Sequence, residues 1–216
     1  MKVIGLDTQI ISSLDPLALE QVTQALQAGR LVAFPTDTVY GLGAMLFDAR
    51  AVDQLYQVKG REAAKAIAVL VGGEADLPQV ALKLDDIAAR LAHRFWPGPL
   101  TLVVPAHPAL PDNLSPLPTV GVRMPDHPVA LALLQRTGPL AVTSANLSGQ
   151  SSVRSAEGVY AQLSGRIHLI LDGGQTPGGL PSTVVDCTGA ELVVLRQGPI
   201  SEGQLKKAAL SALHLP

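Results

Sequence analysis

Three basic residues, Lys59, Arg61 and Lys65, stand close together in the sequence and could bind an anion. Gly60 lets the chain turn between the first two, so that both side chains could reach one phosphate or carboxylate. Arginine would hold it with a planar fork and lysine with a movable point charge. The alternative is structural, because cations at the C-terminal end of a helix also stabilise the helix dipole. The sequence has no glycine-rich loop of the Walker type, so a nucleotide would be held by another device.

Other polar residues that could contact a ligand follow or leave apolar strands. The segments that carry them are residues 34–43, 121–125, 143–149 and 181–186. Hydroxyl and amide groups at strand ends are typical of ligand sites at a sheet edge, although such side chains also satisfy ordinary turns. Arg123 leaves an apolar strand, where a cation needs a partner or a ligand because its burial is costly. Residues 95–101 are better explained as an aromatic contact with the core followed by a rigid turn.

The residue types in these segments favour phosphoryl or nucleotidyl transfer over acid–base or covalent catalysis. Basic residues, hydroxyls and the carboxamide of Asn146 occur there, without a Ser-His-Asp grouping, paired glutamates or a histidine cluster. Such transfer depends mainly on positioning and charge stabilisation, which these residues supply. The histidines, including His93, His107 and His127, lie beside prolines or on helix faces and are predicted to be surface residues.

Composition restricts the class of protein. The 216 residues are 47% hydrophobic and 16% charged, which predicts one domain over residues 1–216 with a substantial core. A formal net charge of -2 and few aromatic residues argue against a dedicated nucleic-acid binder. The single Cys187 can form neither an internal disulfide nor a cysteine-rich zinc site, and it is predicted to be structural. The sequence has no apolar stretch long enough to span a membrane and no secretory signal, which predicts a cytoplasmic protein without membrane contact.

Helices and strands are predicted to alternate along the whole chain. Helices are expected at 16–28 with Asp15 as N-cap, and at 48–59, 85–95, 129–135, 156–163 and from 201 onward. Strands are expected at 31–34, 67–71, 100–104, 119–123, 140–143, 168–171, 183–186 and 191–195. The last two strands would form a hairpin. The pattern therefore predicts an α/β domain with a mixed sheet covered by helices.

Six segments in this order resemble the YrdC family: FPTDTVYGLG, KGR, WPGPLT, VGVRMP, TSANLSG and PSTVVD, within residues 17–198. The resemblance implies a single α/β domain whose twisted mixed sheet and flanking helices surround a basic cavity. It implies the activity of a threonylcarbamoyl-AMP synthase, a nucleotidyltransferase that joins L-threonine, bicarbonate and ATP into threonylcarbamoyl-adenylate and releases pyrophosphate. Mg2+ would accompany the ATP. A partner transferase complex would then pass the threonylcarbamoyl group to tRNA.

The resemblance also implies which residues form the site. The pair Lys59 and Arg61 would be catalytic by stabilising the departing pyrophosphate. The residues implied for ATP are Lys59, Arg61, Lys65, Ser144, Ala145, Asn146 and Arg196. Those implied for threonine are Thr38, Arg123, Thr143 and Ser182, and no residue is implied for a metal. The chain departs from the family pattern at residues 62–66, which lack prolines, and at Leu70, where several members carry a polar residue.

Two other functions stay open from the sequence. One is an RNA-binding module that accepts tRNA or double-stranded RNA on a basic concave face, either as the sole role or as weak binding beside the enzyme activity. The other is a carbamoyl-handling domain like that of hydrogenase-maturation proteins, which share the fold but have much longer chains. RNA affinity that is sensitive to salt and survives alanine at Lys59 and Arg61 would favour the first.

Overall fold

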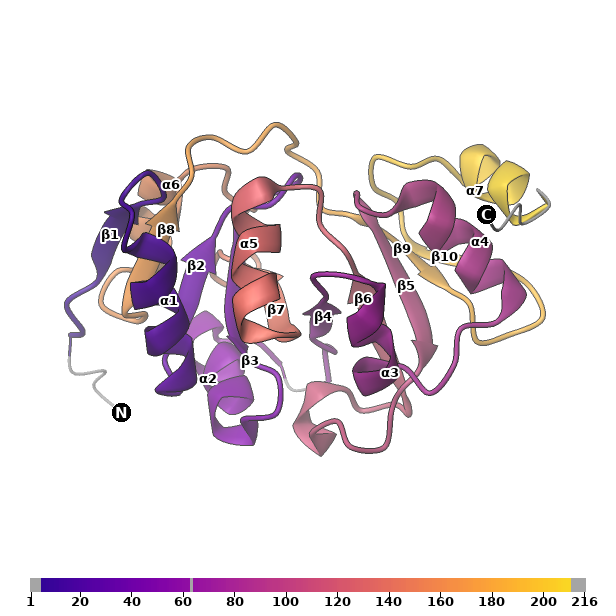
Figure 1. Ribbon diagram of the computed structural model, residues 1–216, viewed down its shortest axis with the longest axis horizontal. Coiled ribbons are helices and arrows are strands. Elements are labelled where there is room, and N and C mark those ends of the chain that lie inside the picture. Colours follow the sequence, from indigo (N-terminus) through magenta and orange to yellow (C-terminus); the bar gives the residue numbers. More distant parts are fainter. Residues whose placement is uncertain (1–4, 63, 211–216) are drawn as a thin grey trace.

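Ten strands form one twisted mixed sheet in the computed structural model, which describes residues 5–62 and 64–210 (Figure 1). The strands are β1 Gln9–Ser12, β2 Val32–Phe34, β3 Gly41–Met45, β4 Ala68–Leu70, β5 Leu100–Pro105, β6 Thr119–Arg123, β7 Leu140–Ser144, β8 Leu169–Asp172, β9 Thr183–Asp186 and β10 Val193–Arg196. Their order across the sheet is β1-β8-β2-β3-β7-β4-β6-β5-β9-β10. The pairs β1–β8, β2–β8, β4–β6 and β5–β9 are parallel and the others antiparallel, so the predicted mixed sheet and the β9–β10 hairpin are confirmed.

Helices cover both faces of this sheet. They are α1 Ala18–Gln27, α2 Ala49–Lys59, α3 Leu77–Val80, α4 Asp86–Phe95, α5 Pro128–Thr137, α6 Ala156–Leu163 and α7 Glu202–Ala209, with short 3-10 turns at Glu74–Asp76 and Asp112–Leu114. Helices α1 and α5 pack side by side in one apolar cluster (Figure 1), and α2, α4, α6 and α7 contribute to the other. No helix in the described part of the chain is long and apolar enough to cross a membrane.

Capping residues set several helix ends as predicted. The carboxylate of Asp48 accepts hydrogen bonds from the first backbone N–H groups of α2, and Gly60 ends that helix with a left-handed φ of 59°. Asp85 caps α4 in the same way, and Ser201 with Gln204 forms a capping box at α7. These contacts join residues at most four positions apart, which is why the sequence alone identifies them.

The start of α1 differs from the prediction. The helix was expected to begin at Pro16 with Asp15 as N-cap, but it begins at Ala18. The Asp15 carboxylate accepts from the Leu17 N–H at 2.8 Å, and the Asp15 carbonyl accepts from the Ala18 N–H at 3.0 Å. Asp15 and Pro16 therefore form a separate turn before the helix, which satisfies the same backbone donors.

The segment after β2 also differs from the prediction. The polar segment 34–43 was expected to continue from a strand into a loop, but Gly41–Met45 form strand β3, between β2 and β7. Glycine is required there by close packing: a Cβ on Gly43 would lie 2.8 Å from a ring carbon of Phe34, and one on Gly41 would lie 2.9 Å from a methyl of Val142. Strand β1 was not predicted at all, because its residues are largely exposed and show no apolar alternation.

Candidate active site

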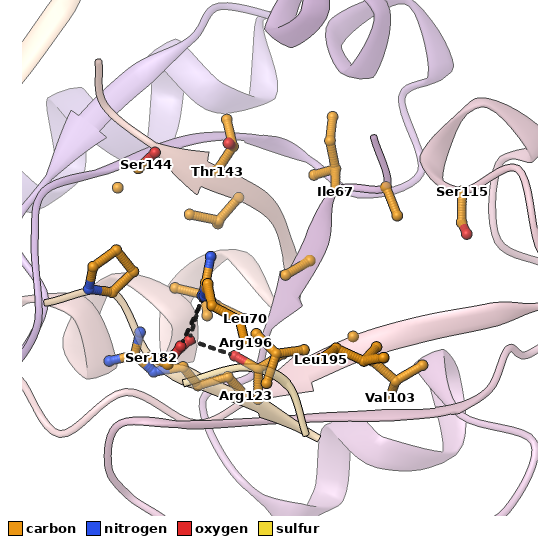
Figure 2. A pocket seen from close by; sticks show the side chains of 18 of the residues that line it. Ile67, Leu70, Val103, Ser115, Arg123, Thr143, Ser144, Ser182, Leu195 and Arg196 are labelled. Carbon is orange, nitrogen blue, oxygen red and sulfur yellow. Dashed lines mark hydrogen bonds between the residues drawn. The ribbon is translucent and has the colours of Figure 1, made fainter. Parts of the chain in front are cut away.

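A cavity of about 370 Å³ lies over the sheet, with lining residues on β3, β4, β5, β6, β7, β9 and β10. Seven of the residues implicated by the sequence line it: Thr38, Arg61, Arg123, Thr143, Ser144, Ser182 and Arg196. Figure 2 shows Thr143 and Ser144 on one side of the hollow and Ser182, Arg123 and Arg196 on the opposite side. The four remaining residues, Lys59, Lys65, Ala145 and Asn146, do not line this cavity. Segments far apart in the sequence therefore converge on one site.

The cavity is basic because three arginines reach it without a carboxylate on its lining. Arg61, Arg123 and Arg196 are among the lining residues, and no aspartate or glutamate of the described chain is. Burial lowers the pKa of Arg196 below its ordinary value, and the charges of Arg123 and then Arg61 lower it further. The charge of Arg196 is therefore close enough to interact with the charges of both other arginines. Three cations held together in this way attract a ligand with more than one negative charge.

Arg123 is held by partners from two other segments. Its Nε donates to the Gly98 carbonyl at 3.0 Å, its Nη1 donates to Thr38 Oγ1 at 3.0 Å, and its Nη2 forms an ion pair with Asp37. A guanidinium has five N–H groups, so two of them have no partner among the described residues. Burial lowers the pKa of Arg123, and Asp37 opposes that shift. The sequence analysis missed Asp37, although it stands next to Thr38 in a segment that was singled out.

Ser182 links Arg196 to strand β5. Arg196 donates from Nε to the Ser182 carbonyl at 3.0 Å and from Nη2 to Ser182 Oγ at 3.1 Å, while Ser182 Oγ lies 2.8 Å from Thr101 Oγ1 (Figure 2). Thr101 is a lining residue that was predicted only to lie at the start of the strand at 100–104. Trp96 does have the predicted structural role, because its Nε1 donates to the Leu100 carbonyl at 2.7 Å.

Lys59 does not project into the cavity as the sequence suggested. Only 3% of the residue is exposed, and its Nζ donates to the carbonyls of Ser144 and Asn146. It therefore ties the C-terminal end of α2 to the loop after β7. Burial lowers the pKa of Lys59 to about 8, and the charge of Arg61 contributes. The expected convergence of Lys59 and Arg61 on one anion is absent in this arrangement, because buried carbonyls bind two of the lysine's three N–H groups.

Arg61 and Lys65 also take different positions. Arg61 lines the cavity and donates to the carbonyls of Lys65 at 3.1 Å and Ala66 at 2.8 Å. Lys65 is exposed and pairs with Glu62 at 3.2 Å. Burial lowers the pKa of Arg61. Of the three clustered cations, Arg61 is the one on the cavity wall.

The amide of Asn146 is directed into its own loop. Its Nδ2 donates to the carbonyls of Leu147 and Gln150, both at 2.8 Å, and its buried Oδ1 has no partner among the described residues. Together with the bonds from Lys59, these contacts fix the main chain at Ser144, whose side chain does line the cavity.

Other candidate groups lie outside the cavity. Cys187 is buried, and burial raises the pKa of its thiol to about 12, in agreement with a structural role. His93 is exposed as predicted, but His127 is half-buried beside Gly173, and its Nδ1 has no partner among the described residues. Among the described residues, no group of three or more histidine, cysteine, aspartate or glutamate side chains is placed to hold a metal ion.

Comparison with known proteins agrees with this fold. The Sua5/YciO/YrdC family, described as telomere recombination, matches residues 24–198, and the chain belongs to this family. A Bacillus subtilis threonylcarbamoyl-AMP synthase is 42% identical over 96% of this chain and 60% of its own length. A Mycobacterium tuberculosis relative is 45% identical, and the match covers 82% of each chain.

Solved structures show the same similarity. Pyrococcus abyssi Sua5 in complex with L-threonine has a TM-score of 0.90 and 39% identity, covering 93% of this chain and 61% of that one. Escherichia coli YciO has a TM-score of 0.79 and 27% identity, covering 90% and 96%. The chain spans 60% and 54% of the two curated synthases from Bacillus subtilis and Pyrococcus abyssi.

Proposed function

We propose that this chain is a threonylcarbamoyl-AMP synthase, which converts L-threonine, bicarbonate and ATP into threonylcarbamoyl-adenylate and pyrophosphate. The observation that carries the proposal is one cavity with three arginines and several hydroxyls but no carboxylate on its described lining. The names of the Bacillus subtilis and Pyrococcus abyssi relatives support the reaction, and the L-threonine complex of Pyrococcus abyssi Sua5 supports the amino-acid substrate.

Threonine is proposed to bind around Arg123. The two N–H groups of Arg123 that have no described partner suit the threonine carboxylate, as a planar fork binds two oxygens at once. Thr38, Thr143 and Ser182 line the same cavity with hydroxyl groups that suit the amine and hydroxyl of threonine. Arg123, Thr143 and Ser182 lie in strands or at a strand end, and Thr38 lies in the turn between β2 and β3, held by its bond to Arg123.

ATP is proposed to bind toward Arg61 and Ser144, with Arg196 between the two substrates. Lys59, Ala145 and Asn146 would shape the loop that presents Ser144, and the third N–H of Lys59 is the one left to reach a phosphate oxygen. Lys65 would have to leave Glu62 to contribute, and its exposed position allows that movement.

The chemistry then needs two bond-forming steps. The threonine amine combines with bicarbonate to give a carbamate and water. A carbamate oxygen next attacks the α-phosphorus of ATP, the bond from that phosphorus to the bridging oxygen breaks, and pyrophosphate leaves with the electron pair. Arg61 on the cavity wall, together with the remaining N–H of Lys59, would stabilise the charge that develops on pyrophosphate.

Mg2+ is proposed to enter with ATP as part of the substrate. The cavity lining offers hydroxyls and arginines but, among the described residues, no carboxylate of the kind that holds a resident Mg2+. The phosphate oxygens would therefore be its ligands. A partner transferase complex acting on tRNA is proposed to consume the adenylate. The reaction is proposed to take place in the cytoplasm.

The experiment is pyrophosphate release from ATP with threonine and bicarbonate added singly and together. Release should require both, and Arg61→Ala should abolish most of it while Cys187→Ser retains it. Equal release with either substrate omitted would contradict the proposal. RNA affinity that is sensitive to salt and unchanged by Arg61→Ala, without any pyrophosphate release, would favour an RNA-binding module instead.

A further inference from the structure

The carboxylate of Asp37 pairs with Arg123 but does not line the cavity. The two side chains form an ion pair in which 7% of the Arg123 side chain and 11% of the Asp37 side chain are exposed. Arg123 is a lining residue and Asp37 is not. The same oxygen of Asp37 accepts a hydrogen bond from the Asp126 N–H at 3.1 Å, so the carboxylate itself is held in place. Asp37 can therefore act on a ligand only through Arg123.

A directed chain of hydrogen bonds continues from Arg123 into the segment around Asp37. Thr36 Oγ1 donates its single proton to the Val39 carbonyl at 2.6 Å. In its 3.0 Å contact with Thr38 Oγ1, Thr36 must then accept, and Thr38 donates. Because Arg123 Nη1 donates to Thr38 Oγ1, that hydroxyl has one lone pair left for the cavity. Thr38 thus presents an acceptor, which suits an amine or hydroxyl donor and not a carboxylate.

The backbone of this segment is held from the other side by the connection between β8 and β9. A Cβ on Gly178 would lie 2.7 Å from the carbonyl oxygens of both Asp37 and Thr38, so the two segments are in direct contact. Thr176 Oγ1 also donates to the Thr38 carbonyl at 3.3 Å. Asp37 and Thr38 therefore cannot shift easily to compensate for a change in their side chains.

We propose that Asp37 is a positioning residue: it fixes the rotation of the Arg123 fork so that two N–H groups meet the carboxylate of an α-amino acid while Thr38 accepts from its amine or hydroxyl. This inference rests on the proposed function, because it takes the Arg123 end of the cavity as the threonine site. It explains why an arginine in a basic cavity keeps a carboxylate partner: the pair orients the guanidinium, and a rotated fork would present only one donor.

Asp37→Asn tests the proposal, because asparagine keeps the size of the side chain and loses the ion pair. Affinity for L-threonine, measured by calorimetry, should fall about tenfold, as expected when one charge-assisted interaction weakens. The KM for threonine should rise by a similar factor, with kcat and the KM for ATP within about twofold, since the phosphate contacts lie elsewhere. The preference for L-threonine over L-threoninamide, which lacks the carboxylate, should fall as well.

Asp48→Asn is the matched control. Asp48 caps α2 and does not line the cavity, and asparagine caps a helix as well as aspartate does, so this change should leave both folding and threonine affinity nearly unchanged. If Asp37→Asn does not fold, Asp37→Glu retains the charge at a displaced position and should show the same split between threonine and ATP. An equal loss for threonine and ATP, or no loss for threonine, would overturn the proposal.

A second readout does not depend on turnover or on threonine. Exchange of the Arg123 Nε–H with solvent, followed by 15N NMR and assigned with Arg123→Lys, should be at least about tenfold faster in Asp37→Asn, because the guanidinium is less restrained. Faster exchange in a protein that neither binds threonine nor releases pyrophosphate would refute the proposed function while leaving the positioning of Arg123 intact. Unchanged exchange would refute the positioning.

Discussion

The two sides of the cavity hold their arginines in different ways. Arg123 bonds to Asp37, Thr38 and Gly98, which come from other segments and lie in or near the core. Among the described residues, the Arg61 side chain bonds to the carbonyls of residues 65 and 66, a few positions along its own chain. The side proposed for the amino acid is therefore assembled before a ligand arrives, whereas the side proposed for the phosphates has donors that a ligand can recruit at small structural cost.

Lys59 shows that position in a motif does not decide which of these two roles a residue has. It is separated from Arg61 by one residue, yet it is buried and bonded to the loop after β7. In this pair, Lys59 bonds to the main chain around Ser144 and Asn146, and Arg61 lines the cavity. The following changes should separate the two roles, in order of decreasing effect.

Arg61→Ala should have the largest effect on activity and almost none on folding. Hydrogen bonds to charged groups are each worth roughly 1.5–3 kcal/mol, and two to phosphate would reduce kcat/KM for ATP by at least about a hundredfold. The melting temperature should stay within about 2 °C, because the described partners of the Arg61 side chain are exposed carbonyls of its own segment. Steady-state kinetics and thermal unfolding measure both. A fall in kcat/KM of less than tenfold would remove Arg61 from the phosphate site.

Lys59→Met should destabilise the protein as well as impair ATP binding. It leaves the buried carbonyl of Asn146 without its described donor, while the Ser144 carbonyl still accepts from the Asn146 N–H at 3.0 Å. A buried unsatisfied group costs about 1–3 kcal/mol, so the free energy of unfolding in urea should fall by about that amount. Lys65→Met is the control and should change it by less than about 0.5 kcal/mol, because Lys65 is exposed. Equal stability of the two variants would show that the Lys59 contacts do not support the fold.

The pH dependence of activity should reflect Lys59. Its pKa is lowered to about 8, so the amine is charged below that pH and loses its charge above it. The value of kcat/KM for ATP, which reports the enzyme without substrate, should fall about fivefold between pH 8 and pH 9. Lys65→Met should keep this profile. A flat profile up to pH 9 would mean that the charge of Lys59 does not contribute.

The lowered pKa of Lys59 also affects the stability of the protein. Its contribution to stability rises with pH, whereas its contribution to activity falls. Because the folded-state pKa of Lys59 lies below the ordinary value of 10.5, the folded protein binds fewer protons than the unfolded chain between about pH 8 and pH 10.5. Stability from this residue therefore increases as the pH rises through that range. Comparing Lys59→Met with the parent at each pH isolates the contribution of Lys59 from those of other groups.

Cys187→Ser should have the smallest effect. The thiol is buried, its raised pKa of about 12 keeps it protonated, and it is absent from the cavity lining. Turnover should stay within about threefold of the parent, and a thiol reagent at pH 8 should react with the folded protein far more slowly than with the unfolded chain. Complete loss of activity in a folded variant would show that Cys187 has a role in catalysis.

The sequence predicts what depends on neighbouring residues. The helices expected from residues 48, 85 and 201 begin within one residue of those positions, since their caps are contacts within one helical turn. The start of α1 is the exception. The Asp15 carboxylate could cap a helix from Pro16, but it accepts from the Leu17 N–H in a separate turn before the helix. The resemblance of six short segments to a known family added the prediction that distant residues meet around a basic cavity, which contacts between neighbouring residues cannot indicate.

What could not be predicted depends on residues far apart in the chain. Asp37 and Arg123 are 86 positions apart, and their pairing is decided by the packing of β6 against the turn after β2. The direction of Lys59 depends in the same way on carbonyls about 85 positions away. Strand β3 was missed because its glycines look like loop residues until Phe34 and Val142 are seen to occupy the space of their side chains.

The most direct test of this two-sided site is calorimetric titration of Arg123→Lys with threonine and with ATP. The substitution keeps the charge and removes the fork. Affinity for threonine should fall about ten- to a hundredfold, the equivalent of one hydrogen bond to a charged group, and affinity for ATP should change by less than about threefold. Loss of ATP binding with unchanged threonine binding would contradict the account, because it would place the nucleotide on the side that is assigned to the amino acid.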